Sequence, residues 1–244
     1  MTNDRSLIRL SGQDSRDFLQ GLITNDVAKT SDGLVYAALL SPQGKYIADF
    51  FVLADGDALV LDVASSHAAN LAQRLAMYRL RAKVDIAESP KVVSRGTGPA
   101  PDGAFIDPRD PNMGWRAYGT EDISDDTNWD SLRVAHVIPE TGIELTPDTY
   151  ILETGFERLN GIDFRKGCYV GQEIAARMKH KTELKKGLVQ VEIEGVAPVG
   201  TEITSNGKSV GTLFTQSGNR ALAHLRFGRA TDEMQASTAT LRLP

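Results

Sequence analysis

The segment LIRLSGQDSRDFLQGLITND, residues 7–26, decides the fold of the N-terminal half of this chain. Its first residues, Leu7–Leu10, predict a β-strand. Apolar residues then recur at helical spacing and predict a helix over residues 15–22, with Ser11 or Asp14 as its N-cap. The polar residues that follow end this helix. A strand that leads directly into a short amphipathic helix is the opening of an α+β unit.

The elements expected after this segment continue the same alternation. Turn sequences rich in Pro, Gly and Asp separate them. We predict, in order, strands at Leu34–Leu40, Tyr46–Leu53 and Ala58–Val63, a helix at Ser65–Leu80 with Ser65 or Ser66 as its cap, and a strand at Val84–Ile86. The order strand, helix, strands, helix, strand predicts an antiparallel sheet covered by helices, so the fold class is α+β.

The second half of the chain changes character twice. Residues 90–130 are rich in Pro and Gly and predict a reduced second module or an irregular connection. From Gly187 onward, short alternating segments and a hairpin turn at residues 205–208 predict a small β-barrel or sandwich. We therefore divide the chain into an N-terminal α+β module (1–88), a second, reduced α+β module (89–183) and a C-terminal β-barrel (184–244).

Composition excludes several classes of function. The chain has 244 residues, 41% of them hydrophobic, and a formal net charge of −5, which argues against general binding to a nucleic-acid backbone. Apolar runs are far shorter than the ~18 residues that a membrane span needs. The N-terminus lacks the basic and apolar regions of a signal peptide. We expect a cytoplasmic protein that contacts neither membrane nor nucleic acid.

The only cysteine, Cys168, lies in the stretch RKGCYVGQE, residues 165–173. A single thiol excludes an intramolecular disulfide, and it cannot supply the roughly four ligands of an iron–sulfur cluster. The four histidines show no metal-ligand spacing, so we expect no metal site. Cys168 is either a small buried hydrophobe or a functional thiol, and its charged neighbours favour the second. Arg165 and Lys166 lead us to expect a partly exposed thiol whose pKa lies below its usual value.

A basic cluster follows the cysteine, and its residues are Arg177, Lys179, His180, Lys181, Lys185 and Lys186. It is either a solvated surface or an anion-attracting rim beside the thiol.

The octapeptide KGCYVGQE (166–173), followed by Ala176-Arg177, resembles the signature of the YgfZ family, folate-binding proteins that assist iron–sulfur enzymes. That family is similar in fold to the aminomethyltransferase of the glycine cleavage system. Further stretches of this chain resemble family landmarks in the expected order, and these are residues 11–14, 18–21, 24–26, 41–45 and 78–81.

The resemblance implies ferredoxin-like α+β modules around a central tetrahydrofolate cavity, with a small C-terminal β-barrel. Under it, Cys168 and Lys166 form the reactive pair. The folate-binding residues implied are Trp129, Arg133, Asp49, Tyr169, Gln172, Glu173 and Arg177. The indole of Trp129 would stack on the pterin ring, with a half-buried core aromatic as the alternative.

The chain departs from the transferases at two positions. Ala135 replaces a pterin-binding glutamate, and Ala48 replaces the first of two aspartates, of which Asp49 is the second. Loss of these carboxylates weakens aminomethyl-transfer chemistry, which needs polar groups near the folate nitrogens.

Three functions follow as hypotheses. The first is a tetrahydrofolate-dependent accessory factor for iron–sulfur enzymes, whose partners are client or assembly proteins and whose thiol is a transient ligand or redox partner. The second is a folate-dependent one-carbon transferase. The third is a folate-binding scaffold with an inert cysteine. The sequence leaves the client, the form of folate, any covalent chemistry and the oligomeric state open.

Overall fold

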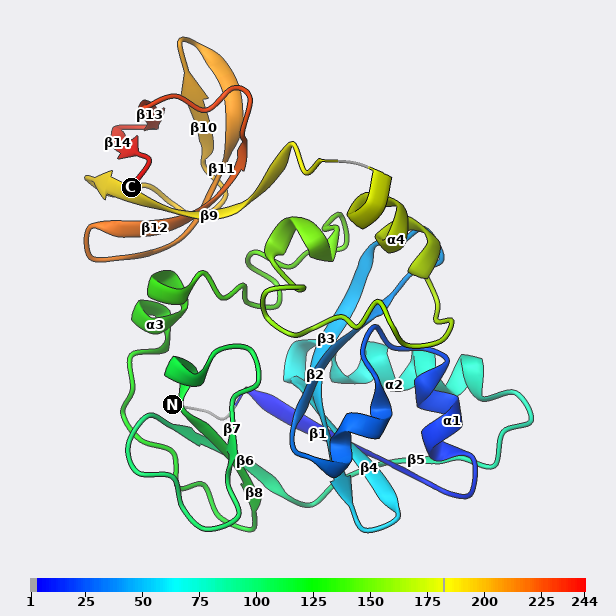
Figure 1. Ribbon diagram of the computed structural model, residues 1–244. Helices are drawn as coiled ribbons and strands as arrows, with labels where there is room; N and C mark the ends of the chain where they lie inside the picture. Colours follow the sequence, from blue (N-terminus) through cyan, green and yellow to red (C-terminus); the bar gives the residue numbers. More distant parts are fainter. Residues whose placement is uncertain (1–3, 182) are drawn as a thin grey trace. The chain divides into compact units, whose positions relative to one another are not determined.

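A computed structural model describes residues 4–181 and 183–244 of the chain. The elements group into two compact units, and each is discontinuous in sequence (Figure 1). The first unit runs to Thr127 and includes Phe156–Ala176, while the second contains Asn128–Gly155 and Arg177–Pro244. Residues 89–183 contribute to both units, and the three-part division expected from the sequence stays a prediction.

The first unit is built on a five-stranded antiparallel sheet in the order β2-β3-β4-β1-β5. Within it, β1, α1, β3, β4, α2 and β5 follow the β-α-β-β-α-β order of a ferredoxin-like module, with β2 added at the edge. The bounds are β1 Arg5–Ser11, α1 Ser15–Gln20, β2 Val35–Leu40, β3 Tyr46–Asp55, β4 Ala58–Ala64, α2 Ser65–Arg79 and β5 Asp85–Glu88, with a 3-10 turn at Val27–Ser31.

One core lies between this sheet and its helices. Leu71 and Leu75 of α2 are fully buried, and they join alternate residues of the strands in a single apolar cluster. Because one face of each strand and one stripe of each helix are apolar, this packing removes both from water. The predicted fold class, α+β, is confirmed.

A small second sheet completes the first unit, in the order β6-β8-β7, with bounds Val92–Gly96, Trp115–Gly119 and Phe105–Ile106, and a 3-10 turn at Pro111–Met113. Arg116 of β8 bridges two buried carboxylates, at 3.0 Å to Asp62 of β4 and 3.2 Å to Asp107. Its guanidinium lies 3.9 Å from the centre of the Phe51 ring. These paired, buried charges join the small sheet to the large one.

The second unit is a closed barrel in the order β10-β11-β12-β9-β14-β13. The bounds are β9 Lys186–Glu194, β10 Glu202–Ser205, β11 Lys208–Ser217, β12 Arg220–Arg226, β13 Glu233–Ala236 and β14 Ala239–Arg242, together with α3 Trp129–His136 and a 3-10 turn at Ile151–Thr154. The helix α4, Gln172–Lys181, begins in the first unit and ends in the second.

Of the predicted helix caps, Asp14 is confirmed in position, whereas Ser65 and Ser66 are wrong. Asp14 stands at the N-cap position of α1 without capping it, because its Oδ2 accepts a bond from the Lys83 backbone N–H at 2.7 Å. Ser65 is the first residue of α2 rather than its cap, and the preceding Ala64 provides no capping side chain. Among the described residues, no helix combines the length and apolar character needed to cross a bilayer.

Candidate functional site

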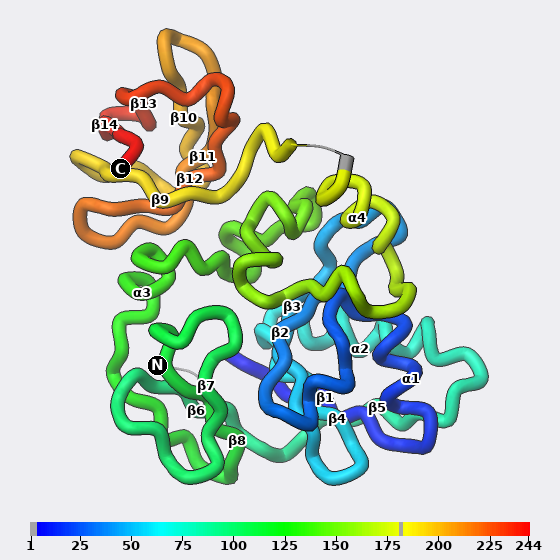
Figure 2. The backbone as a smooth tube through the Cα atoms, viewed as in Figure 1, coloured from blue at the N-terminus to red at the C-terminus, as the bar shows by residue number. Residues whose placement is uncertain are grey.

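The cysteine loop, residues 165–171, lies against the turn that joins β2 to β3 (Figure 2). Gly171 has φ +83°, and a Cβ on it would stand 2.6 Å from the Ser41 carbonyl oxygen. On the other side, a Cβ on Gly44 would stand 2.7 Å from Cβ of Ile174 in α4. Both positions need glycine, because backbone approaches the opposing segment too closely for a side chain.

A network of polar bonds holds the chain just before this loop. The Thr24 hydroxyl donates to the Gly161 carbonyl at 2.6 Å, and the Asp163 N–H donates to the Thr24 carbonyl at 3.0 Å. Asn25 donates to the Asn160 carbonyl at 2.7 Å. Thr24 and Asn25, which follow the first helix, thus anchor a segment more than 130 residues further along the chain.

Lys166 is buried and fixes the loop from inside. Its ammonium group donates to the carbonyl oxygens of Gln20 at 2.7 Å and Ile23 at 2.6 Å, and it lies 5.0 Å from the centre of the Tyr169 ring. Burial lowers the pKa of Lys166 from 10.5 to about 8. The structure therefore gives Lys166 a positioning role, and its action on the thiol stays a prediction.

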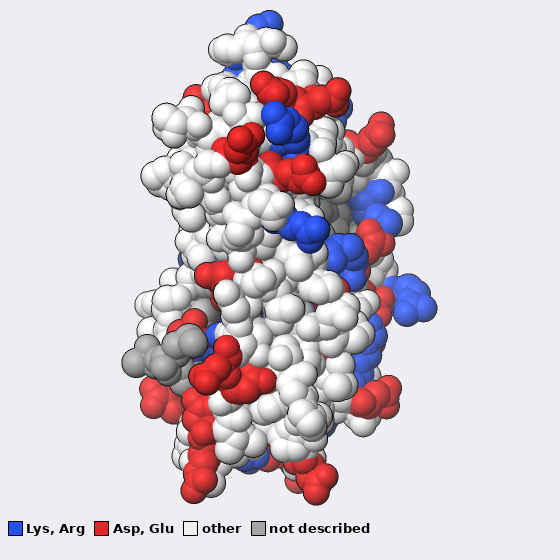
Figure 3. Space-filling model, turned by 90° about the vertical axis from the view of Figure 1, so that its left-hand side faces the viewer, with Lys and Arg blue, Asp and Glu red and all other residues white. Residues whose placement is uncertain are grey.

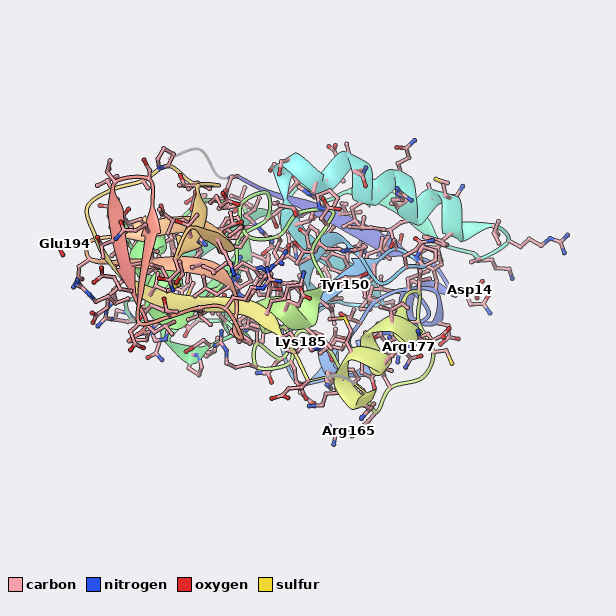
Figure 4. The ribbon with its side chains drawn as sticks, turned by 90° about the horizontal axis from the view of Figure 1, so that it is seen from above. Asp14, Tyr150, Arg165, Arg177, Lys185 and Glu194 are labelled. Carbon is pink, nitrogen blue, oxygen red and sulfur yellow. The ribbon has the colours of Figure 1, made fainter. Side chains whose placement is uncertain are left out.

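Cys168 is exposed, as predicted, and exposed and buried residues alternate around it in the loop. Arg165 extends into solvent with 90% of its side chain exposed (Figure 4). Tyr169 is 93% buried, and its hydroxyl finds no hydrogen-bond partner within the described part of the chain. Burial raises the pKa of this phenol well above its usual value. The loop thus holds a solvent-facing thiol between two buried anchors, Lys166 and Tyr169.

The remaining predicted residues of the motif lie on α4. Gln172 is the first residue of this helix and its N–H donates to the Tyr169 carbonyl at 3.2 Å. Glu173 and Arg177 are exposed one turn apart. A carboxylate in the first turn of a helix is favoured by the helix dipole, which gives Glu173 a local structural explanation.

Asp49 is buried in the sheet of the first unit. Its two carboxylate oxygens accept bonds from Tyr36 at 2.9 Å and Tyr46 at 2.7 Å. Burial and this carboxylate raise the pKa of Tyr36 well above its usual value, so the phenol remains a donor. Asp49 therefore has a structural partner on each oxygen, and its folate-binding role stays a prediction.

Trp129 and Arg133 both lie on α3 in the second unit. Trp129 is half-buried and begins the helix, whose N-cap Asn128 accepts from the Ser131 N–H at 3.1 Å. Arg133 is buried and donates to Glu144 at 3.2 Å, Thr215 at 2.9 Å and the Ile138 carbonyl at 3.1 Å. These bonds join α3 to Glu144 and to Thr215 of the barrel strand β11. The cavity expected to unite Trp129, Asp49 and Cys168 stays a prediction.

No cluster of three or more His, Cys, Asp or Glu side chains suited to a metal ion occurs within residues 4–181 and 183–244. On the face drawn in Figure 3, acidic and basic side chains are interspersed.

Comparison with solved structures identifies the fold. The chain matches the glycine cleavage system aminomethyltransferase T from Bartonella henselae with a TM-score of 0.77, covering 99% of this chain and 83% of that one. At 14% sequence identity this match establishes the aminomethyltransferase-like fold alone.

Comparison of sequences then gives named relatives. Residues 185–244 match the family described as CAF17, C-terminal beta-barrel domain. The iron-sulfur cluster assembly factor IBA57, mitochondrial, of Mus musculus is 29% identical over 270 residues, covering 91% of this chain and 75% of the mouse protein. The Homo sapiens protein of the same name is 28% identical, with the same coverage.

The expected similarity to proteins that assist iron–sulfur assembly is confirmed. The relatives named are IBA57 proteins rather than YgfZ proteins. Because these relatives are mitochondrial by name, the cytoplasmic location stays a prediction.

Proposed function

We propose that this protein is an accessory factor for the assembly or repair of iron–sulfur proteins and that Cys168 is its functional thiol. The observation that carries the proposal is an exposed thiol on an internally anchored loop. An inert structural cysteine is typically buried as a small hydrophobe, and Cys168 is not. The names of the sequence relatives support the same role.

The loop is suited to presenting one ligand to a partner. A cluster needs about four ligands, and this chain has a single cysteine, so the others would come from the client or assembly protein. Because Lys166, Tyr169 and Gly171 fix the backbone on both sides of Cys168, little conformational freedom is lost when the thiolate binds.

Tetrahydrofolate is part of this proposal as a ligand, and the residues present fit it only in part. Trp129 is half-buried, and Gln172, Glu173 and Arg177 lie near or at the surface. Arg133 and Asp49 are already bonded to protein groups. We therefore derive no chemical step through folate.

The fold favours a second candidate, a folate-dependent one-carbon transferase. Against it, Asp49 is engaged by two tyrosines, and alanines occupy positions 48 and 135. A tetrahydrofolate-dependent turnover assay with purified protein separates this candidate from the accessory role.

The test of the main proposal is complementation of cells that lack this protein. Iron–sulfur enzyme activities are measured after expression of the wild type, Cys168→Ala, Cys168→Ser and the surface control Lys208→Gln, an exposed position outside the cysteine loop. We expect both cysteine variants to fail and the control to restore activity, at equal protein levels. Full restoration by Cys168→Ala would make the protein a scaffold with an inert cysteine.

A further inference from the structure

A strongly basic pocket lies in the barrel unit, built from residues that the cysteine motif does not include. It has a volume of about 400 Å³ and is lined by Lys185, Lys186, Arg226, Gly228 and Arg229. This volume is within the range of small-ligand sites. Lys185, labelled in Figure 4, lies just before β9. The structure thus groups the two lysines with two arginines more than 35 residues further along the chain.

Strand pairing brings these like charges together. Lys186 of β9 is directly opposite Arg226 of β12 in the antiparallel register. The Phe227 N–H continues this ladder by donating to the Lys185 carbonyl at 2.9 Å. Two like charges placed directly opposite each other destabilise a sheet. A local cost of this kind is expected at functional sites.

The turn after β12 adds the fourth cation. The N–H groups of Arg229 and Ala230 both donate to the Arg226 carbonyl, at 2.9 and 3.0 Å. This single helical turn places Arg226 and Arg229 three residues apart on one side. The Phe227 ring fixes the turn against β9, because a Cβ on Gly187 would stand 3.0 Å from it.

The pocket holds more positive charge than its surroundings neutralise. Lys186 pairs with Glu153 at 3.2 Å, and that carboxylate also lies 3.4 Å from His224. Lys185, Arg226 and Arg229 have no ion-pair partner within residues 4–181 and 183–244. The chain as a whole is acidic, with 32 acidic and 27 basic residues. Its overall composition therefore does not explain three cations around one cavity that lack an ion-pair partner in the described part of the chain.

We propose that this pocket binds a small anion that carries at least two charged oxygen groups, either phosphates or carboxylates. Two guanidinium groups can each bind a phosphate or carboxylate through paired hydrogen bonds, and the lysines add point charge. Gly228 leaves the backbone at the pocket open, since a Cβ there would meet nothing within 4 Å. The proposal requires no chemistry at Cys168, and its test uses neither the thiol nor tetrahydrofolate.

The experiment is calorimetric titration of the full chain with two probes, inorganic pyrophosphate and γ-linked triglutamate. These separate a phosphate source from a carboxylate source. We expect at least one probe to bind with a Kd of about 1 mM or tighter at low salt, and to weaken as salt is added. Arg226→Gln and Arg229→Gln should each weaken that binding at least about tenfold.

The matched control is Arg220→Gln, which removes the same charge from the opposite end of β12, where Arg220 faces Glu192 across the strand pair. It should change Kd less than about twofold. The proposal is overturned if neither probe binds, or if Arg220→Gln weakens binding as much as Arg226→Gln. Should Arg226→Gln fail to fold, Arg229→Gln, which lies outside the strand, still decides the question.

Discussion

The Lys166 ammonium nitrogen lies 2.6 Å from the carbonyl oxygen of Ile23, although the two residues are 143 positions apart. The same nitrogen also satisfies Gln20, so one buried side chain closes the end of α1. A lysine that a sequence motif suggests as a reactive group is, in the structure, the internal anchor of the loop that presents Cys168. This assignment can be tested without any ligand.

Lys166→Met should lower the free energy of unfolding by ~2–3 kcal/mol, because two buried carbonyl groups lose their donor. Urea unfolding measures the change. Lys208→Met, at the exposed tip of the β10–β11 hairpin, is the matched control and should cost less than about 0.5 kcal/mol. Equal losses in the two variants would show that Lys166 does not anchor the loop.

Gly171→Ala should destabilise the protein by more than ~2 kcal/mol, because its Cβ would collide with the Ser41 carbonyl as well as strain the backbone. Gly56→Ala isolates the backbone effect, since Gly56 has φ +62° and open space around it. We expect a loss of about 1 kcal/mol there. Thermal unfolding of both variants gives the difference, and a Gly171→Ala loss no larger than that of Gly56→Ala would contradict the close packing of the two turns.

Asp107 should contribute a pH-dependent part of stability. Burial raises the pKa of this carboxyl, but Arg109 and Arg116 outweigh burial and hold it at about 2, below the ordinary 3.8. Because the folded pKa is the lower one, the stabilisation is complete above pH 4 and is lost as pH falls from about 4 to 2. The full effect is ~2 kcal/mol.

Asp107→Asn should therefore differ most from wild type at pH 6, with a difference that shrinks by ~2 kcal/mol on acidification to pH 2. Denaturant unfolding across this range is the measurement. Asp57→Asn, at an exposed position, is the control for the substitution itself. A constant offset for Asp107→Asn would refute the buried ion-pair assignment.

Arg133→Lys should lower stability by about 2–4 kcal/mol, because an ammonium group cannot reach Glu144, Thr215 and the Ile138 carbonyl together. The control Arg242→Lys, in an exposed pair with Glu233, should change stability by less than about 0.5 kcal/mol. Chemical denaturation distinguishes the two. If Arg133→Lys is as stable as the wild type, the structural role of the Arg133 guanidinium is wrong, and this group is available to a ligand in the wild type.

Local sequence patterns were sufficient for the order and class of most elements. Three predicted elements match the structure closely: the strands at residues 34–40 and 46–53 are β2 and β3, and the helix at 65–80 is α2. Each has an apolar pattern long enough to be recognised in the sequence. The hairpin at 205–208 is confirmed, with Asn206 and Gly207 at φ +50° and +71°. The strands β13 and β14 were not predicted.

Long-range contacts explain what the sequence could not show. The motif predicted the exposed Cys168, yet nothing near Lys166 in the chain indicates that its ammonium binds carbonyls at residues 20 and 23. Arg133 likewise resembles a ligand-binding residue until Glu144 and Thr215 are placed around it. Buried polar residues take their partners from the tertiary fold, which short sequence windows do not contain.

The interleaving of the two units has a consequence during synthesis on the ribosome. The first unit is complete in sequence once Ala176 has emerged, and it can then fold around residues 128–155, which it does not use. These residues complete their contacts only when the barrel strands are made, because Thr215, the partner of Arg133 and Glu144, lies 82 and 71 residues further along the chain. Until then the nascent chain carries two charged side chains destined for burial, so the packing of α3 depends on completion of the barrel.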